Sequence, residues 1–124
     1  MLQQGVLDVT QESSVTVLTV APRFNYIDEL MVQELHIPLV RACDEADPPI
    51  VVVDLSNAEF VGSSFIELLL PVWNRMEGKA GGRLAFCNLT EMCQEVFEVT
   101  HLTRLWEFYN TRAEAVAAMG NSTA

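Results

Sequence analysis

The chain has 124 residues, half of them hydrophobic and 19% charged, which is enough to build one globular domain with a packed core. Its net charge of -10 at pH 7 opposes binding to nucleic-acid phosphates and to anionic membrane surfaces. The composition therefore argues against both of these classes of ligand and favours a protein partner with a basic surface.

Three cysteines, Cys43, Cys87 and Cys93, form no CxxC pair. This odd number predicts reduced, buried thiols instead of a disulfide framework or a metal site. No apolar run approaches the roughly 20 residues that cross a bilayer, and the N-terminus has no signal-peptide pattern. We therefore expect a cytoplasmic protein without membrane insertion, metal or other cofactor.

The first elements in the chain are two short β-prone runs at residues 5–9 and 15–20, joined by a polar turn, which predict a β-hairpin. Asn25 is then expected to cap a helix that carries acidic residues in its first turn. Pro38 lies inside this helix and predicts a kink or a break. The inward stripe of the helix is expected to be Ile27, Leu30, Met31, Leu35, Leu39 and Cys43.

The rest of the chain alternates between strands and helices. Residues 50–55 are continuously apolar and β-branched, as in a strand covered on both faces. Further elements are expected as a helix at 63–77, a strand at 83–87, a helix at 90–100, a strand at 105–109 and a last helix behind the capping-box sequence at 111–114.

This order predicts one α/β domain over residues 1–120, with a frayed tail at 121–124. After the opening hairpin, the alternation of helices and strands predicts a mixed, largely parallel sheet of four to five strands with about four helices.

The start of the helix at 63–77 carries two adjacent serines, Ser63 and Ser64. A helix start offers unpaired amide groups and the positive end of the helix dipole, which suit a hydroxyl that carries or binds negative charge. Ser64 and Glu67 have capping-box spacing, which would leave the hydroxyl of Ser63 free beside Gly62. A phosphate on Ser63 would add about 1.5 to 2 negative charges and could repel a bound partner. The alternative is that both serines only cap the helix.

Two further features surround these serines. Asp54 ends the buried strand, and we expect it, with Ser56, to support the turn that presents the serines. The helix itself has apolar residues on more sides than one stripe can hold, so either the core covers several of its sides or part of it faces a partner. In the second case the docking surface would consist of Gly62, Phe65, Leu69 and Trp73.

The sequence contains no motif of an enzyme. A receiver domain would need acidic metal ligands in addition to Asp54 and a lysine near its last strand, but the only lysine is Lys79. A serine hydrolase would need a paired base and a glycine after the nucleophile, whereas Ser63 is followed by serine. His36 and His101 belong to no catalytic or metal-binding pattern. We therefore expect a binding protein.

The serine junction, a downstream segment and the order of elements together resemble the STAS domain family, which includes the bacterial anti-sigma factor antagonists. The family pattern is an apolar strand ending in Asp-Leu-Ser, then a short loop, then Asp-Ser-Ser-Gly opening an apolar helix. The matching segments here are Asp54-Leu55-Ser56, Phe60-Val61-Gly62-Ser63-Ser64, residues 95–102, Leu105-Trp106 and Glu114-Ala115-Val116.

The resemblance implies a STAS fold and the role of an anti-sigma factor antagonist. In those antagonists an ATP-dependent anti-sigma factor kinase phosphorylates the first serine of the pair, which corresponds by position to Ser63. The unphosphorylated antagonist binds the anti-sigma factor and frees the sigma factor, so that sigma-dependent transcription proceeds, and phosphorylation ends this binding.

Two residues depart from the family pattern, because Gly62 stands in place of Asp and Phe65 in place of Gly. They leave open a second class of function, a non-phosphorylated STAS scaffold or accessory subunit of a transporter or sensor complex. A third possibility is a carrier of a small ligand in an apolar cleft near Trp73.

Overall fold

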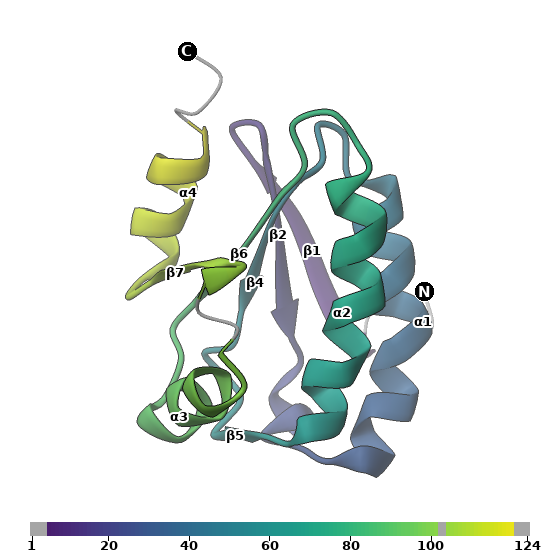
Figure 1. Cartoon of the computed structure of the whole chain (residues 1–124), viewed down its shortest axis with the longest axis vertical. Helices are drawn as coiled ribbons and strands as arrows, with labels where there is room; N and C mark the ends of the chain where they lie inside the picture. Colours follow the sequence, from purple (N-terminus) through teal and green to yellow (C-terminus); the bar gives the residue numbers. More distant parts are fainter. Residues whose placement is uncertain (1–4, 102–103, 121–124) are drawn as a thin grey trace.

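A five-stranded sheet forms the centre of the computed structural model, which describes residues 5–101 and 104–120 (Figure 1). The antiparallel hairpin of β1 and β2 lies at one edge, and all the other neighbouring strands are parallel. The predicted α/β class, with its opening hairpin and largely parallel sheet, is confirmed. The spatial order of the strands is β1 (Leu7–Glu12), β2 (Val15–Val20), β4 (Ile50–Asp54), β6 (Arg83–Cys87) and β7 (Glu107–Tyr109).

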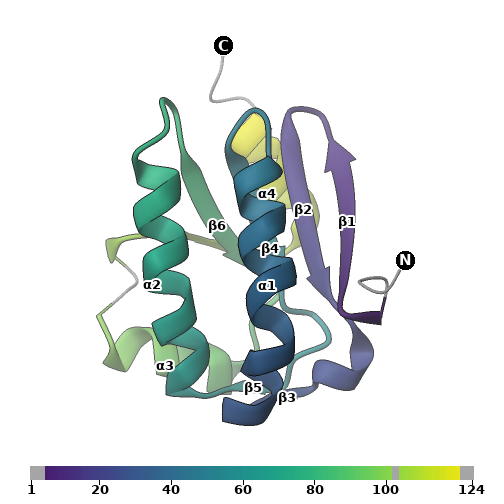
Figure 2. The same cartoon turned by 90° about the vertical axis from the view of Figure 1, so that its right-hand side faces the viewer.

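Helices cover both faces of the sheet. The helices α1 (Glu29–Glu45) and α2 (Ser63–Glu77) lie side by side on one face, and α4 (Arg112–Gly120) lies on the other (Figure 2). Side chains of β4 alternate between the two sides: Val51 and Val53 pack in the core below α1 and α2, whereas Val52 packs with α4. This double burial is why β4 has no polar face.

A second, two-stranded sheet positions the starts of α1 and α2. Its strands, β3 (Tyr26–Ile27) and β5 (Phe60–Val61), are parallel and directly precede these helices. The remaining helix, α3 (Glu91–Val99), packs against β5 at the same end of the molecule (Figure 1). Neither β3 nor β5 was predicted, because a two-residue strand is too short to show a periodic pattern.

The start of α1 differs from the prediction. Asn25 is not the N-cap, because its carbonyl accepts hydrogen bonds from the amides of Glu59 and Phe60 at the start of β5, and the chain then continues into β3. The N-cap is Asp28, whose carboxylate accepts from the Met31 amide at 3.0 Å. This later start leaves Leu30 exposed, whereas Leu35, Leu39 and Cys43 are buried as predicted.

The prolines do not interrupt their helices. Pro38 lies inside α1 and Pro71 inside α2, and both helices continue through them. Of the kink or break predicted at Pro38, the break is therefore wrong, because packing of the two helices on the sheet outweighs the loss of one backbone donor in each. The predicted tail at 121–124 lies outside the described residues.

Candidate functional site

The loop that leads from β4 to α2 begins at a buried carboxylate. Asp54, 4% exposed, accepts hydrogen bonds from the Ser56 amide at 2.9 Å and from the side-chain amide of Asn88 at 3.1 Å. Asn88 follows β6 and has a positive φ of 60°, a conformation that Asn tolerates better than most residues. Asp54 thus holds the first turn of the loop through the Ser56 amide and links it, through the Asn88 side chain, to the residue that follows the neighbouring strand β6.

Further hydrogen bonds hold the rest of this loop. The side chain of Asn57 donates to the Val20 carbonyl at 2.9 Å, and the Thr90 hydroxyl donates to the Glu59 carbonyl at 2.8 Å. The Gly62 amide donates to the backbone of β3 at 2.9 Å. Since these partners belong to three separate parts of the fold, the loop presents the start of α2 in a defined position.

The predicted capping box is not formed. The N-cap of α2 is Gly62, and no side chain caps the helix. The physical reason is that β5 runs up to Val61, so the helix begins directly after it and Ser64 is already its second residue. Ser63 is exposed, and its hydroxyl makes no hydrogen bond with any residue that the structure describes. Although the capping box is absent, the described residues therefore leave the hydroxyl of Ser63 free at the start of the helix, as the phosphorylation hypothesis requires.

The proposed docking residues divide into two groups. Phe65 and Leu69 are 0% and 1% exposed, so their assignment to a docking surface is wrong, because both point into the core between the helices and the sheet. Trp73 is half-buried and packs against that core. Gly62 is half-exposed, and a Cβ added there would lie 3.6 Å from the Ile27 carbonyl oxygen, an ordinary contact.

The structure places other apolar side chains near the serines. Tyr26 is 50% exposed and Leu30 is 71% exposed, and the Tyr26 ring lies 6.1 Å from the ring of Phe60. The parallel pairing of β3 with β5 puts the start of α1 beside the start of α2. We call the surface formed by Tyr26, Leu30, Phe60, Gly62 and Ser63 the serine face.

The serine face has an acidic surround. The segments that build it, residues 24–32 and 57–68, contain no lysine or arginine. Their carboxylates are all exposed: Asp28, Glu29, Glu59 and Glu67. A partner that approaches this face with basic and apolar groups would match it in charge and in polarity.

Comparisons with known proteins agree with this fold. The model of the STAS domain family matches residues 6–115. The chain belongs to the STAS domain family. A comparison with curated proteins found no significant match.

Solved structures of anti-sigma factor antagonists superpose on nearly the whole chain. An anti-sigma-factor antagonist (STAS) domain protein from Planctomyces limnophilus is 38% identical with a TM-score of 0.86, covering 91% of this chain and 97% of that one. An anti-sigma factor antagonist from Mycobacterium paratuberculosis is 24% identical with a TM-score of 0.77, and 92% of each chain is covered. The antagonist SpoIIAA in its unphosphorylated form is 17% identical with a TM-score of 0.70, covering 91% of this chain and 95% of that one. Because the last two structures are less identical in sequence, their likeness supports the fold alone.

The thiols of this STAS domain are free and buried, as predicted. Burial, and then the nearby Asp54 carboxylate, raises the pKa of Cys87 to about 12, and burial likewise raises the pKa of Cys43 to about 12. Both sulfurs are therefore protonated at neutral pH and act as small core side chains.

Within the described residues, no three His, Cys, Asp or Glu side chains come together in a way that could hold a metal ion. In the same part of the chain, no helix combines the length and the apolar character needed to cross a membrane.

Proposed function

We propose that this STAS domain is a cytoplasmic anti-sigma factor antagonist that binds an anti-sigma factor kinase through the serine face and is switched off by phosphorylation of Ser63. The family match and the 38% identity to an anti-sigma-factor antagonist domain support the general role. The observation that carries the finer proposal is Ser63 itself, an exposed serine at the start of α2 whose hydroxyl makes no hydrogen bond within the described part of the chain.

The kinase supplies the chemistry of the switch, and the STAS domain acts as its substrate. The Ser63 oxygen attacks the γ-phosphorus of ATP, a new O–P bond forms, and the bond from the γ-phosphorus to the bridging oxygen breaks to release ADP. The hydroxyl proton passes to a base of the kinase. In this proposal the STAS domain needs no cofactor and no catalytic residue.

The charge of the serine face explains how a phosphate would end binding. The amides at the start of α2 would stabilise a phosphate on Ser63, so the fold would tolerate it. The phosphate would nevertheless add about 1.5 to 2 negative charges beside Asp28, Glu59 and Glu67. It would also keep water next to Leu30 and Tyr26, which a partner must desolvate in order to bind.

The second candidate is a STAS scaffold or accessory subunit of a transporter or sensor complex whose binding does not depend on phosphorylation. The observation in its favour is the helix start, where Gly62 provides no side chain to orient a neighbouring hydroxyl. This candidate predicts a partner that binds the serine face equally well with and without ATP.

Intact-mass measurement after incubation with ATP and an anti-sigma factor kinase tests the proposal. The wild type should gain one phosphoryl group, Ser63→Ala should gain none, and the matched control Ser64→Ala should be modified like the wild type. Modification of Ser63→Ala, or no modification by a kinase that is active on its own antagonist, would refute the assignment of Ser63.

Binding of the same kinase then separates the two candidates. Isothermal titration should show that Ser63→Asp binds at least about tenfold more weakly than Ser63→Ala. Equal affinities would exclude the switch and favour the scaffold.

A further inference from the structure

One edge of the central sheet is open to pairing. β1 has β2 as its neighbour on one side, and among residues 5–101 and 104–120 no strand pairs with its other side. Natural edge strands are commonly protected by charged side chains, above all lysine, by proline or by a bulge. β1 contains no proline and no lysine, and its register with β2 is uninterrupted from Leu7 to Glu12. Its charged residues are Asp8 and Glu12, and Val9, on the opposite face, is 53% exposed.

The backbone orientation of β1 follows from one hydrogen bond. The Ala21 amide donates to the Val6 carbonyl at 2.9 Å, so the polar groups of Val6 point toward β2. Orientation alternates along an antiparallel strand, and the N–H and C=O groups of Leu7, Val9 and Gln11 therefore point to the free edge.

We propose that β1 pairs antiparallel with β1 of a second copy of this chain, with Val9 opposite Val9, and that the protein forms a homodimer with a continuous sheet. The outward-pointing residues of the two copies must face each other, so the possible registers differ in steps of two residues. The charged residues of β1 favour one of these registers over the others.

The register with Val9 opposite Val9 places Asp8 opposite Thr10 and Leu7 opposite Gln11, and no like charges meet. A shift in one direction places Asp8 opposite Asp8, and a shift in the other places it opposite Glu12, both of which are repulsive. Still larger shifts pair fewer residues. The strand is thus self-complementary in one register, which is the requirement of a two-fold symmetric interface.

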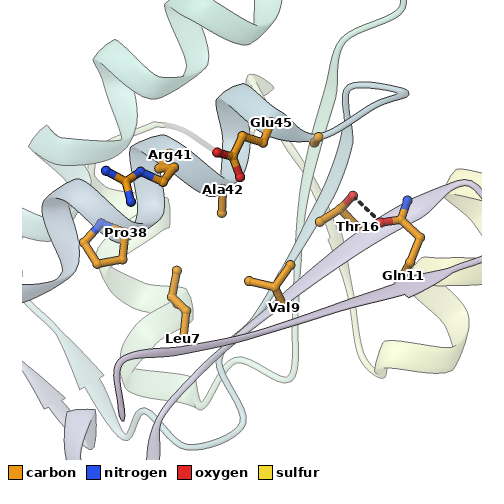
Figure 3. A pocket seen from close by; sticks show the side chains of 9 residues that line it. Leu7, Val9, Gln11, Thr16, Pro38, Arg41, Ala42 and Glu45 are labelled. Carbon is orange, nitrogen blue, oxygen red and sulfur yellow. Dashed lines mark hydrogen bonds between the residues drawn. The ribbon is translucent and has the colours of Figure 1, made fainter. Parts of the chain in front are cut away.

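The face of β1 that carries Val9 is only partly covered by α1. Leu7, Val9 and Gln11 line a cavity of about 270 Å³ against the side of α1, where Pro38 and Arg41 also line it (Figure 3). In the dimer, the same row of side chains continues on the second copy and covers the exposed Val9.

Charge also sets the strength of the dimer. Pairing through one strand buries less surface than a permanent interface, and each copy carries a net charge of -10. The dimer is therefore weak, and salt strengthens it by screening the repulsion.

The symmetry has a consequence for binding. The two-fold axis is perpendicular to the sheet and reverses the strand direction, so the serine faces lie at opposite ends of the dimer. If these faces bind a partner as proposed above, the dimer is bivalent. The dimer itself does not depend on that function.

Sedimentation equilibrium of the full chain tests the proposal. The average mass should rise toward twice that of the monomer as concentration increases, and it should rise further at about 0.5 M salt. Val9→Lys, which places two ammonium groups opposite each other, should weaken the dimer about tenfold or more. The control Val99→Lys, at a 70% exposed position on α3, should behave like the wild type.

Disulfide formation tests the register and does not require Val9→Lys to fold. Mild oxidation should cross-link Val9→Cys into a dimer but leave Gln11→Cys monomeric, because only residue 9 faces its own copy. A wild-type protein that remains monomeric at all concentrations would overturn the proposal. So would Val9→Lys with wild-type mass, or equal cross-linking at positions 9 and 11.

Discussion

Replacing the buried carboxylate at the end of β4 should loosen the loop that presents the serine face. Asp54→Ala removes the carboxylate that accepts two hydrogen bonds, and both donors, the Ser56 amide and the Asn88 side chain, lose this acceptor. A hydrogen bond to a charged group contributes about 1.5 to 3 kcal/mol, and since these two share one carboxylate, we expect a total loss of about 3 kcal/mol. For a domain of this size, that loss lowers the melting temperature by about 10 °C.

Urea denaturation measures this loss, and hydrogen exchange of the Ser56 amide shows where it acts. Ser56→Ala is the matched control: the bond to Asp54 uses the backbone amide, so this variant should stay within about 0.5 kcal/mol of the wild type. The reasoning fails if Asp54→Ala costs less than about 1 kcal/mol and the exchange of the Ser56 amide is unchanged.

Further variants test the start of α2 and the core. Gly62→Asp should raise the free energy of unfolding by a few tenths to about 1 kcal/mol, because a carboxylate at the N-cap accepts from free amides; a lower value in urea denaturation would contradict this. Phe65→Ala should lower the free energy of unfolding by about 3 to 5 kcal/mol, because the ring is fully buried. A loss near zero in thermal denaturation would show that Phe65 is not a core residue. Cys43 and Cys87, with pKa values raised by burial to about 12, should react with a thiol reagent at about pH 8 only after unfolding. Rapid labelling of the native protein would show that these thiols are accessible.

The elements with strong local patterns were predicted well. The helix at 63–77 has the predicted bounds, since a dense apolar run follows β5 and Gly78 ends it. The continuous apolar run of β4 indicated burial on both faces, which the structure confirms. Prediction was weaker where the pattern was short: neither β3 nor β5 was found, and without them the N-cap positions of α1 and α2 were misplaced.

The exposure of residues within α2 could not be predicted from its own sequence. Phe65 and Trp73 look alike in a helix that is apolar on several sides, yet one is in the core and the other is at its margin. The exposed apolar residues of the serine face, Tyr26 and Leu30, come from a segment far away in the chain. No spacing rule within one helix connects such segments.

By itself, the sequence determined the α/β class, the order of the longer elements and the place of Ser63 at the start of a helix. These features depend on interactions between residues a few positions apart, which periodicity and capping signals report directly. Only the tertiary structure decided that Asn88 meets Asp54, that Tyr26 packs near Phe60 and that β1 is an open edge. These contacts arise when strands distant in sequence pair, and pairing is a property of the whole sheet that no local segment encodes.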